Sequence, residues 1–544
     1  MQKQQTIGGY LIDQLLKRGA DHVFGVPGDY VLTFFKQLEE SPLKIINTTD
    51  EQGAGFAADA YARIRGIGVA CVTYGVGGLK VVNAAAQAFS EKSPLVIITG
   101  APGVKERVRH TLLHHKVRNY DTQIRIFEHV TVASTVLDNP KTAFAEIDCV
   151  LDAAQRFSQP VFIEIARDMV LAKGHPPRHK TSPRPASDPA ALREALAEAI
   201  PRINRSKKPV FIMGNEIHRF GLQKAALQLI DKSNIPFVTL LQSKSVLPET
   251  HPLYMGVYEG GVGLRDVRAY VEKSDCLILL GAELNDINLG IFTAKLDTRV
   301  SIFAAREKTS IAHHHFSGIQ LEDFINKLKL PLKKRIRPKT PRPPMDVTFA
   351  PKTNRKITVK RLFECLNALL EDHHIVVSDT GDALFGASDL YIHRSAEFMA
   401  CAYYASLGFS VPAAIGVQLA NPKQRPIVLV GDGAFQMTGM ELSTAARFNL
   451  NPIVILLNNG GYGTERPIQE GLFNDLQNWK YHLIPEVLGA GHGFDVHTEE
   501  EFLDAMTAVG KLKQLSLIEV HLAQGDFSPA LMRLTGEMRR RMGK

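Results

Sequence analysis

Two short apolar segments with polar, glycine-rich ends constrain the fold of this chain most strongly. Residues 427–430 (IVLV) and 452–457 (PIVILL) are apolar throughout. Such segments are typical of parallel strands that helices cover on both faces. A helix is expected between the two strands, which makes the unit a right-handed β-α-β crossover. The sequence therefore predicts an open α/β sheet in this part of the chain.

Polar residues follow each of these strands directly. The first strand ends in GDGA, residues 431–434, and the second ends in NNGG, residues 458–461. In a β-α-β crossover both ends open on the same edge of the sheet, so Asp432 and Asn459 are expected to converge. A carboxylate, an amide and a nearby backbone carbonyl suit Mg²⁺, which also takes phosphate oxygens. Either glycine cluster alone would be explained as an ordinary turn, but the pair predicts a site for magnesium and a diphosphate.

Two helix starts are expected from their first residues. Thr438 and Glu441 form a capping-box pattern, which predicts that the crossover helix begins there. Asp50 and Glu51 are expected to open a helix that continues through small residues to position 60. Small residues cost helix stability but let another backbone approach closely, so this helix is predicted at a subunit interface. From its position alone, Glu51 would be explained as a partner of the helix dipole.

The spacing of these motifs resembles that of thiamine diphosphate enzymes, since 24 residues lie between Gly433 and Asn458. Further motifs are GVPGDY at 25–30, Glu51, the pair His114-His115, and GYGTE at 461–465. Together they resemble the 2-oxo acid decarboxylases that act on pyruvate, indolepyruvate, phenylpyruvate and branched-chain acids. The resemblance runs from Gly8 to Phe527. The histidine pair together with the late glutamate separates this group from acetolactate synthases, benzoylformate decarboxylases and aldehyde lyases.

This resemblance implies a function for particular residues. Those implied in catalysis are Asp29, Glu51, His114, His115 and Glu465. Those implied in cofactor binding are Glu51, Thr380, Asp382, Ala405, Leu407, Gly431, Asp432, Gly433, Ala434, Asn459, Gly461, Tyr462 and Gly463. The implied magnesium ligands are Asp432, Asn459 and Gly461, and the implied substrate pocket comprises Leu384, Phe385, Thr464 and Ile468. In the family the glutamate matching Glu51 binds the cofactor pyrimidine, and the residue matching Leu407 bends the cofactor; Leu407 could equally be an ordinary core leucine.

The implied activity is non-oxidative decarboxylation of a 2-oxo acid to an aldehyde and CO₂, through a C2 thiazolium carbanion and an enamine. The cofactors would be thiamine diphosphate and Mg²⁺, and the protein would supply orientation and proton transfer. Leu384 stands where strict pyruvate decarboxylases have tryptophan, so a broad range of branched aliphatic and aryl acids is expected. The alternatives are a carboligase or lyase of the same cofactor class, or a strict pyruvate or indolepyruvate decarboxylase. A homodimer with shared active sites is the implied minimum, and a homotetramer the expected state.

Three α/β domains account for the length of 544 residues. Two proline-rich basic segments, 174–189 and 331–344, are expected to be linkers. The predicted fold class is α/β, with three open, mostly parallel sheets: a pyrimidine-binding domain at 1–180, a structural or regulatory middle domain at 190–335, and a diphosphate- and magnesium-binding domain at 350–544. The middle part contains no GxGxxG motif after a strand, so no dinucleotide is expected there.

The net charge of +8 does not indicate nucleic-acid binding. Much of the excess lies in the linkers, without a helix that could enter a groove or aromatics that could stack on bases. The arginines at 539–541 are expected to be solvated or loosely docked. No apolar run is long enough to cross a membrane, and five cysteines without CxxC spacing are expected to be reduced core thiols. A cytoplasmic protein is therefore predicted, with a small-molecule substrate and neither nucleic acid nor membrane as partner.

The remaining histidine clusters need separate interpretation. Adjacent side chains diverge, and no third ligand stands at a recognisable spacing from His114 and His115, which argues against a metal site. A proton relay fits this pair better, because histidine both gives and accepts protons near neutral pH. The histidines at 313–315 and the pair His373-His374 are expected at the surface.

Overall fold

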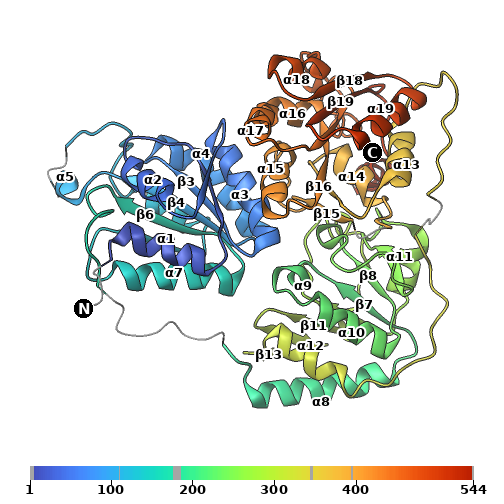
Figure 1. Cartoon of the computed structure of the whole chain (residues 1–544). Coiled ribbons are helices and arrows are strands. Elements are labelled where there is room, and N and C mark those ends of the chain that lie inside the picture. Colours follow the sequence, from blue (N-terminus) through green and yellow to red (C-terminus); the bar gives the residue numbers. More distant parts are fainter. Residues whose placement is uncertain (1–4, 109–110, 176–184, 344–346, 394–395, 542–544) are drawn as a thin grey trace.

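Three lobes make up the chain, each built on one sheet (Figure 1). The computed structural model describes residues 5–108, 111–175, 185–343, 347–393 and 396–541. The N-terminal lobe holds a six-stranded sheet of order β2-β1-β3-β4-β6-β5, parallel throughout. Its strands are β1 (His22–Gly25), β2 (Lys44–Asn47), β3 (Gly68–Val72), β4 (Leu95–Ala101), β5 (Ala133–Leu137) and β6 (Val161–Ala166).

Helices cover both faces of this first sheet, because its strands are buried on both sides. The helices are α1 (Ile7–Lys17), α2 (Leu32–Glu39), α3 (Glu51–Arg65), α4 (Val76–Ser90), α5 (Val104–Val108), α6 (Thr122–Glu128) and α7 (Ala143–Phe157). One apolar cluster joins the sheet to α3, α4 and α6, and another joins it to α1, α2 and α7.

The middle lobe carries a seven-stranded sheet of order β13-β12-β11-β10-β7-β8-β9. Its strands are β7 (Pro209–Met213), β8 (Phe237–Thr239), β9 (Tyr254–Val257), β10 (Cys276–Leu280), β11 (Ser301–Ala305), β12 (Lys308–Ile311) and β13 (His314–Ser317). The last two strands pair antiparallel at one edge, and the others pair parallel. Its helices are α8 (Pro189–Arg205), α9 (Glu216–Arg219), α10 (Gln223–Ser233), α11 (Arg265–Glu272) and α12 (Leu321–Lys329), with 3-10 turns η1 (Leu241–Ser243) and η2 (Thr298–Val300).

The C-terminal lobe has a parallel six-stranded sheet of order β15-β14-β16-β17-β19-β18. Its strands are β14 (His374–Ser378), β15 (Glu397–Ala400), β16 (Arg425–Gly431), β17 (Ile453–Asn458), β18 (His492–Val496) and β19 (Ser516–His521). Its helices are α13 (Val359–Leu369), α14 (Asp382–Ser388), α15 (Ser410–Ala420), α16 (Asp432–Thr438), α17 (Leu442–Arg447), α18 (Ile484–Val487), α19 (Glu499–Lys511) and α20 (Pro529–Arg541). The 3-10 turns are η3 (Gly439–Glu441), η4 (Leu472–Asn474) and η5 (Tyr481–Leu483).

The predicted α/β class with three mostly parallel sheets is confirmed. The proposed domain boundaries stay predictions. Residues 331–343 form no helix or strand, as expected of a linker, whereas much of the other predicted linker, 176–184, lies outside the described residues. No helix among the described residues combines the length and the apolar character that crossing a membrane requires.

The predicted capping box in the crossover is wrong. The crossover begins with α16 at Asp432, and η3 and α17 follow it. The Thr438 hydroxyl donates to the Gly408 carbonyl at 2.6 Å and caps no helix. The Glu441 carboxylate accepts the backbone N–H groups of Thr49 and Asp50, each at 3.1 Å from Oε1. A tertiary contact with the N-terminal lobe therefore replaces the local pattern.

The predicted start of α3 is confirmed, and the predicted subunit interface at its small residues stays a prediction. Asp50 caps the helix by accepting the Gln52 N–H at 2.7 Å. The helix packs against α15 of the same chain, where the N-terminal and C-terminal lobes meet (Figure 1). A Cβ added at Gly416 of α15 would lie 1.9 Å from the Ala57 carbonyl oxygen. The expected close approach of another backbone to α3 is thus found within one chain, where α15 provides it and the two lobes meet.

One surface prediction needs correction. Four cysteines are buried as expected, but Cys149 is exposed on α7. The arginines at 539–541 end α20, and Arg539 and Arg540 are exposed, in agreement with the expected solvation. The Arg539 guanidinium also donates to the Pro467 carbonyl at 2.6 and 2.8 Å. The histidines at 313–315 are exposed as predicted.

His374 is buried, so its predicted position at the surface is wrong. This residue is the first of β14, and its Nδ1 accepts the Glu371 N–H at 3.0 Å. Burial, with the nearby charges of His373 and Arg425, lowers the pKa of His374 from its ordinary 6.5 to about 4. Its neighbour His373 is half exposed.

This burial predicts acid lability. Between about pH 6.5 and pH 4 the unfolded chain binds a proton at His374 that the folded chain does not, so stability falls as the pH drops through this window and is retained above it. In His374→Asn, which keeps an acceptor for the Glu371 N–H, the fall in melting temperature between pH 7 and pH 5 should shrink. The matched control is His315→Asn, which replaces an exposed histidine on β13 and should keep the wild-type fall; equal slopes in all three proteins would contradict the prediction.

Candidate active site

A cavity of about 280 Å³ opens at the carboxyl ends of β14, β16 and β17. The parallel pairing of Gly431 with Leu457 places the two glycine-rich ends side by side. The predicted cofactor, metal and substrate residues that line this cavity are Thr380, Asp382, Ala405, Leu407, Gly431, Asp432, Gly433, Ala434, Asn459, Gly461, Tyr462, Gly463 and Thr464, together with Glu465.

Asp432 is held at the start of α16 by two backbone donors. Gly433 N–H donates to its Oδ1 at 2.8 Å, and Gly461 N–H donates to its Oδ2 at 2.9 Å. Burial raises the pKa of Asp432 to about 6, although these donors favour its charged form. The carboxylate therefore joins the two strand ends, and a cation in front of it would favour ionisation further.

Polar atoms without partners point to a ligand in this cavity. The buried Oδ1 atoms of Asn459 and Asp382 accept no hydrogen bond from the described residues. A buried acceptor without a donor is costly, so a ligand at this position would relieve that cost. A Cβ added at Gly461 would lie 2.0 Å from the Asn474 carbonyl oxygen, so only glycine lets the backbone pass there. Oxygen acceptors beside a closely approaching backbone suit a hard cation that carries a diphosphate.

The wall facing these ligands comes from the loop before α15. Ala405 adopts a left-handed backbone conformation, with φ of 58°, and Leu407 lines the cavity. Leu407 is half-buried and also packs against the apolar cluster beneath α16. Both of the proposed functions of this leucine, cavity wall and core packing, are therefore compatible with its position.

Asp29, His114 and His115 form a separate group in the N-terminal lobe. The His114 Nε2 lies 2.8 Å from Asp29 Oδ2, and the Tyr30 ring stacks on the His114 ring with centroids 4.8 Å apart. His115 has a left-handed backbone, with φ of 66°, and its buried Nδ1 has no partner among the described residues. A ligand atom of Asp29 lies within 4.8 Å of ligand atoms of both histidines. Asp29 precedes His114 by 85 residues, so sequence spacing gives no sign of this group, whereas the family resemblance already places Asp29 with the two histidines.

Glu51 lies at the first turn of α3, where its side chain is mostly buried and its carboxylate is 2.9 Å from the Lys80 ammonium. Within one chain, neither Glu51 nor the Asp29-His114-His115 group lines the cavity at Asp432. Glu465 does line it. A single chain thus brings together the predicted metal and diphosphate residues and leaves four of the predicted catalytic residues apart from them.

Comparison with known proteins decides the family. Three family models match: the N-terminal, central and C-terminal domains of thiamine pyrophosphate enzymes, at residues 5–121, 196–327 and 379–520. The chain is 36% identical to an indole-3-pyruvate decarboxylase of Azospirillum brasilense, over 97% of this chain and 98% of that protein. It belongs to the thiamine diphosphate-dependent 2-oxo acid decarboxylase family. Other relatives are an alpha-keto-acid decarboxylase of Mycobacterium leprae (31% identical, 97% of this chain and 95% of that protein) and pyruvate decarboxylase 1 of Arabidopsis thaliana (31%, 97% and 90%).

This decarboxylase is therefore a carboxy-lyase that uses thiamine diphosphate. Of the predicted substrate-pocket residues, Thr464 lines the cavity and three do not. Leu384 and Phe385 are buried in an apolar cluster with α20. Ile468 is half-buried in the segment after Glu465. Within one chain, three of the four residues expected to select the substrate thus do not line this cavity.

Asp379 is a positioning residue of the decarboxylase that the sequence analysis missed. It is fully buried at the end of β14, and its carboxylate accepts N–H groups from Thr380, Gly408 and Ser410 at 2.9 to 3.0 Å. It also accepts the Ser410 hydroxyl at 2.8 Å. It therefore fixes both Thr380 and the loop that carries Leu407. The only signal in the sequence was an acidic residue directly after an apolar strand.

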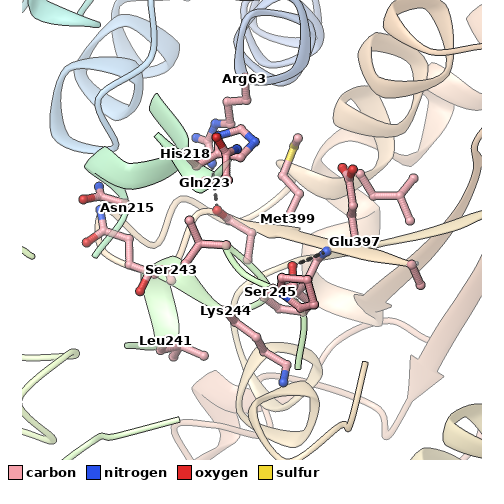
Figure 2. Close-up of a pocket in the computed structure, with 18 of the residues that line it drawn as sticks. Arg63, Asn215, His218, Gln223, Leu241, Ser243, Lys244, Ser245, Glu397 and Met399 are labelled. Carbon is pink, nitrogen blue, oxygen red and sulfur yellow. Dashed lines mark hydrogen bonds between the residues drawn. The ribbon is translucent and has the colours of Figure 1, made fainter. Parts of the chain in front are cut away.

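A larger cavity of about 660 Å³ lies among the three lobes of the decarboxylase (Figure 2). Arg63 comes from the N-terminal lobe, His218 and Lys244 from the middle lobe, and Met399 from the C-terminal lobe. The Lys244 ammonium is bound to Glu249 at 2.9 Å, and burial lowers the pKa of His218 to about 3. None of the predicted site residues lines this cavity, so size alone does not mark the site of the chemistry.

Proposed function

We propose that this decarboxylase acts on a broad range of branched aliphatic and aryl 2-oxo acids, releasing an aldehyde and CO₂. The observation that carries the proposal is the cavity where Asp432, Asn459 and Gly461 converge. Relatives named for indole-3-pyruvate, alpha-keto acids and pyruvate support a range of substrates. Leucine at position 384, in place of a larger aromatic residue, supports acids longer than pyruvate.

We propose that Asp432, Asn459 and the Gly461 carbonyl hold Mg²⁺, which in turn holds the diphosphate of the cofactor. The unpaired Asn459 Oδ1 and the position of the Asp432 carboxylate between the two strand ends support this assignment. Thiamine diphosphate, when bound, supplies the electron sink that decarboxylation requires. Leu407 forms the wall that shapes the bound cofactor, and Thr380, Asp382 and Ala405 complete it.

The chain's own ionisable residues are proposed to manage protons around the substrate. The Asp29 carboxylate, 2.8 Å from His114 Nε2, orients that imidazole for proton transfer. The unpaired Nδ1 of His115 remains able to exchange a proton. Glu465, at the cavity mouth, faces the departing carboxylate. Glu51 is proposed to bind the pyrimidine ring and control its protonation.

Because these residues lie apart from the cavity within one chain, we propose that a second copy completes each site. In a two-fold dimer, Glu51, Asp29, His114 and His115 of one chain would face Asp432 and Glu465 of the other. A homotetramer built from two such dimers is proposed. We also propose a cytoplasmic location, since four of the five thiols are buried and free.

Aldehyde release tests the proposed substrate range. Purified protein with thiamine diphosphate and Mg²⁺ is offered pyruvate, 2-oxoisovalerate, 2-oxoisocaproate, phenylpyruvate, indolepyruvate and benzoylformate, with alcohol dehydrogenase as the coupling enzyme. A preference for branched and aryl acids supports the proposal. A single accepted acid would indicate a strict pyruvate or indolepyruvate decarboxylase. Acyloin as the main product, with little free aldehyde, would favour the carboligase alternative.

The Asp432→Ala variant should lose cofactor binding. Removing a direct ligand should weaken Mg²⁺-dependent binding of thiamine diphosphate by more than about 100-fold, the upper end for loss of an outer-shell partner. Cofactor affinity can be followed by quenching of intrinsic fluorescence, and activity should fall in parallel. The matched control is Asp389→Ala, which removes a carboxylate paired with Arg533 away from the cavity. Wild-type affinity in Asp432→Ala would refute the assigned ligand.

A further inference from the structure

A second group of metal-ligating side chains lies farther along the same edge of the C-terminal sheet. Asp495 is near the end of β18, His497 follows that strand, and His521 ends β19. The pairing of Asp495 with Glu519 brings the two neighbouring strands into register there. His482 approaches from η5. Three histidines and two carboxylates therefore converge outside the active-site cavity.

The distances within this group suit a small tetrahedral cation. Around zinc, ligand atoms at 2.0–2.1 Å from the ion lie about 3.3 Å from one another. Asp495 Oδ1 is 3.4 Å from His497 Nε2 and 2.6 Å from His521 Nε2, and the three atoms lie within 4.8 Å of one another. Small side-chain adjustments would place all three around one ion. Asp495 and His497 are exposed, so an ion could reach them.

Neighbouring hydrogen bonds hold these side chains in place. His497 N–H and Thr498 N–H donate to Glu501 at 2.7 and 3.0 Å, within the capping box that begins α19. The buried Glu519 carboxylate is 2.6 Å from His482 Nδ1 and accepts the Asn458 amide at 2.7 Å. Glu519 Oε1 also lies 3.6 Å from His521 Nε2, and His482 Nδ1 lies 3.8 Å from Asp495 Oδ1, so these two residues stand directly behind the outer groups.

The two outer imidazole rings lie side by side. The His497 and His521 rings stack with centroids 4.1 Å apart and planes 5° apart. Both imidazoles direct Nε2 toward the same oxygen of Asp495. The stacking therefore brings two nitrogen ligand atoms to one carboxylate oxygen.

We propose that Asp495, His497 and His521 bind one Zn²⁺ ion per chain, with water as the fourth ligand. Two imidazoles and a carboxylate are a ligand set that zinc accepts, and an open fourth position is filled by solvent. The site is distinct from the cavity at Asp432. Glu519 connects the two regions, since its partner Asn458 directly precedes Asn459.

Metal titration of the holoenzyme tests this proposal. Protein is stripped with a chelator, saturated with thiamine diphosphate and Mg²⁺, and titrated with Zn²⁺ by calorimetry and with Co²⁺ by absorption. The wild type should bind one Zn²⁺ per chain at this site and give the visible bands of tetrahedral Co²⁺. His497→Ala and His521→Ala should each weaken Zn²⁺ binding by at least about tenfold, because loss of even an outer-shell partner costs that much.

Two further variants make the result specific. His314→Ala removes an exposed histidine that pairs with Glu198 at 2.8 Å and has no third ligand group near it among the described residues, so Zn²⁺ binding should stay at the wild-type level. His115→Ala identifies any ion held by the Asp29 group, whose loss should leave the Asp495 site filled. Melting curves confirm that each variant is folded. Equal Zn²⁺ affinity in wild type, His497→Ala and His521→Ala, or a Co²⁺ spectrum without tetrahedral bands, would overturn the proposal.

Discussion

Mixing Glu51→Gln chains with Asp432→Ala chains is expected to restore activity that neither variant has alone. The structure places the two residues in different lobes, and Glu51 does not line the cavity that contains Asp432. If sites form between chains, a mixed dimer has one site with both substitutions and one with neither. A statistical mixture of equal amounts should therefore recover about a quarter of the wild-type activity.

The outcome separates two assemblies clearly. If Glu51 and Asp432 of the same chain formed each site, every site in every mixture would carry one substitution, and activity would stay at the level of the variants. Co-expression from two differently tagged genes allows the chains to mix during folding. A control mixture of Glu51→Gln with Glu51→Ala chains should remain inactive, because no site in it has an intact glutamate. Size-exclusion chromatography establishes that the variants still associate.

Topology rules explain why part of the candidate site could be predicted from the sequence. Apolar segments identified β16 and β17, and the crossover rule placed Asp432 and Asn459 at one sheet edge. These inferences depend on local pattern and on a general rule of parallel sheets. They needed no knowledge of which distant segments touch.

The predictions that failed depend on contacts between distant segments. Glu441 has the residue type and position of a capping residue, but the backbone of Thr49 and Asp50 takes its carboxylate. His374 lies in a polar stretch of sequence, yet it is buried as the first residue of a central strand. Asp379 was missed because three of its donors belong to a loop and helix about thirty residues later.

The Asp59→Ala substitution is expected to destabilise the N-terminal lobe by about 3–5 kcal/mol, the range for breaking one partner of a buried ion pair. Asp59 lies in α3 with no exposed surface, and it accepts two guanidinium hydrogen bonds from Arg63, at 2.8 and 2.9 Å. It also accepts the Gln87 amide at 2.9 Å, and the Arg63 Nη1 donates to the Ala400 carbonyl at 2.8 Å. The alanine variant would leave the arginine charge buried without its partner, between two lobes.

Thermal unfolding followed by circular dichroism measures this effect, and a loss of this size should lower the midpoint by about 10 °C. The surface pair of Asp21 and Arg65 supplies the control, because Asp21→Ala removes an exposed carboxylate and should cost about 0–1 kcal/mol. The double variant Asp59→Ala with Arg63→Met should recover part of the loss, since neither charge then remains buried. A midpoint for Asp59→Ala equal to that for Asp21→Ala would show that the buried pair contributes no more than a surface pair. A large loss with partial recovery in the double variant would mean that the cost comes from an unpaired arginine charge buried where α3 meets β15.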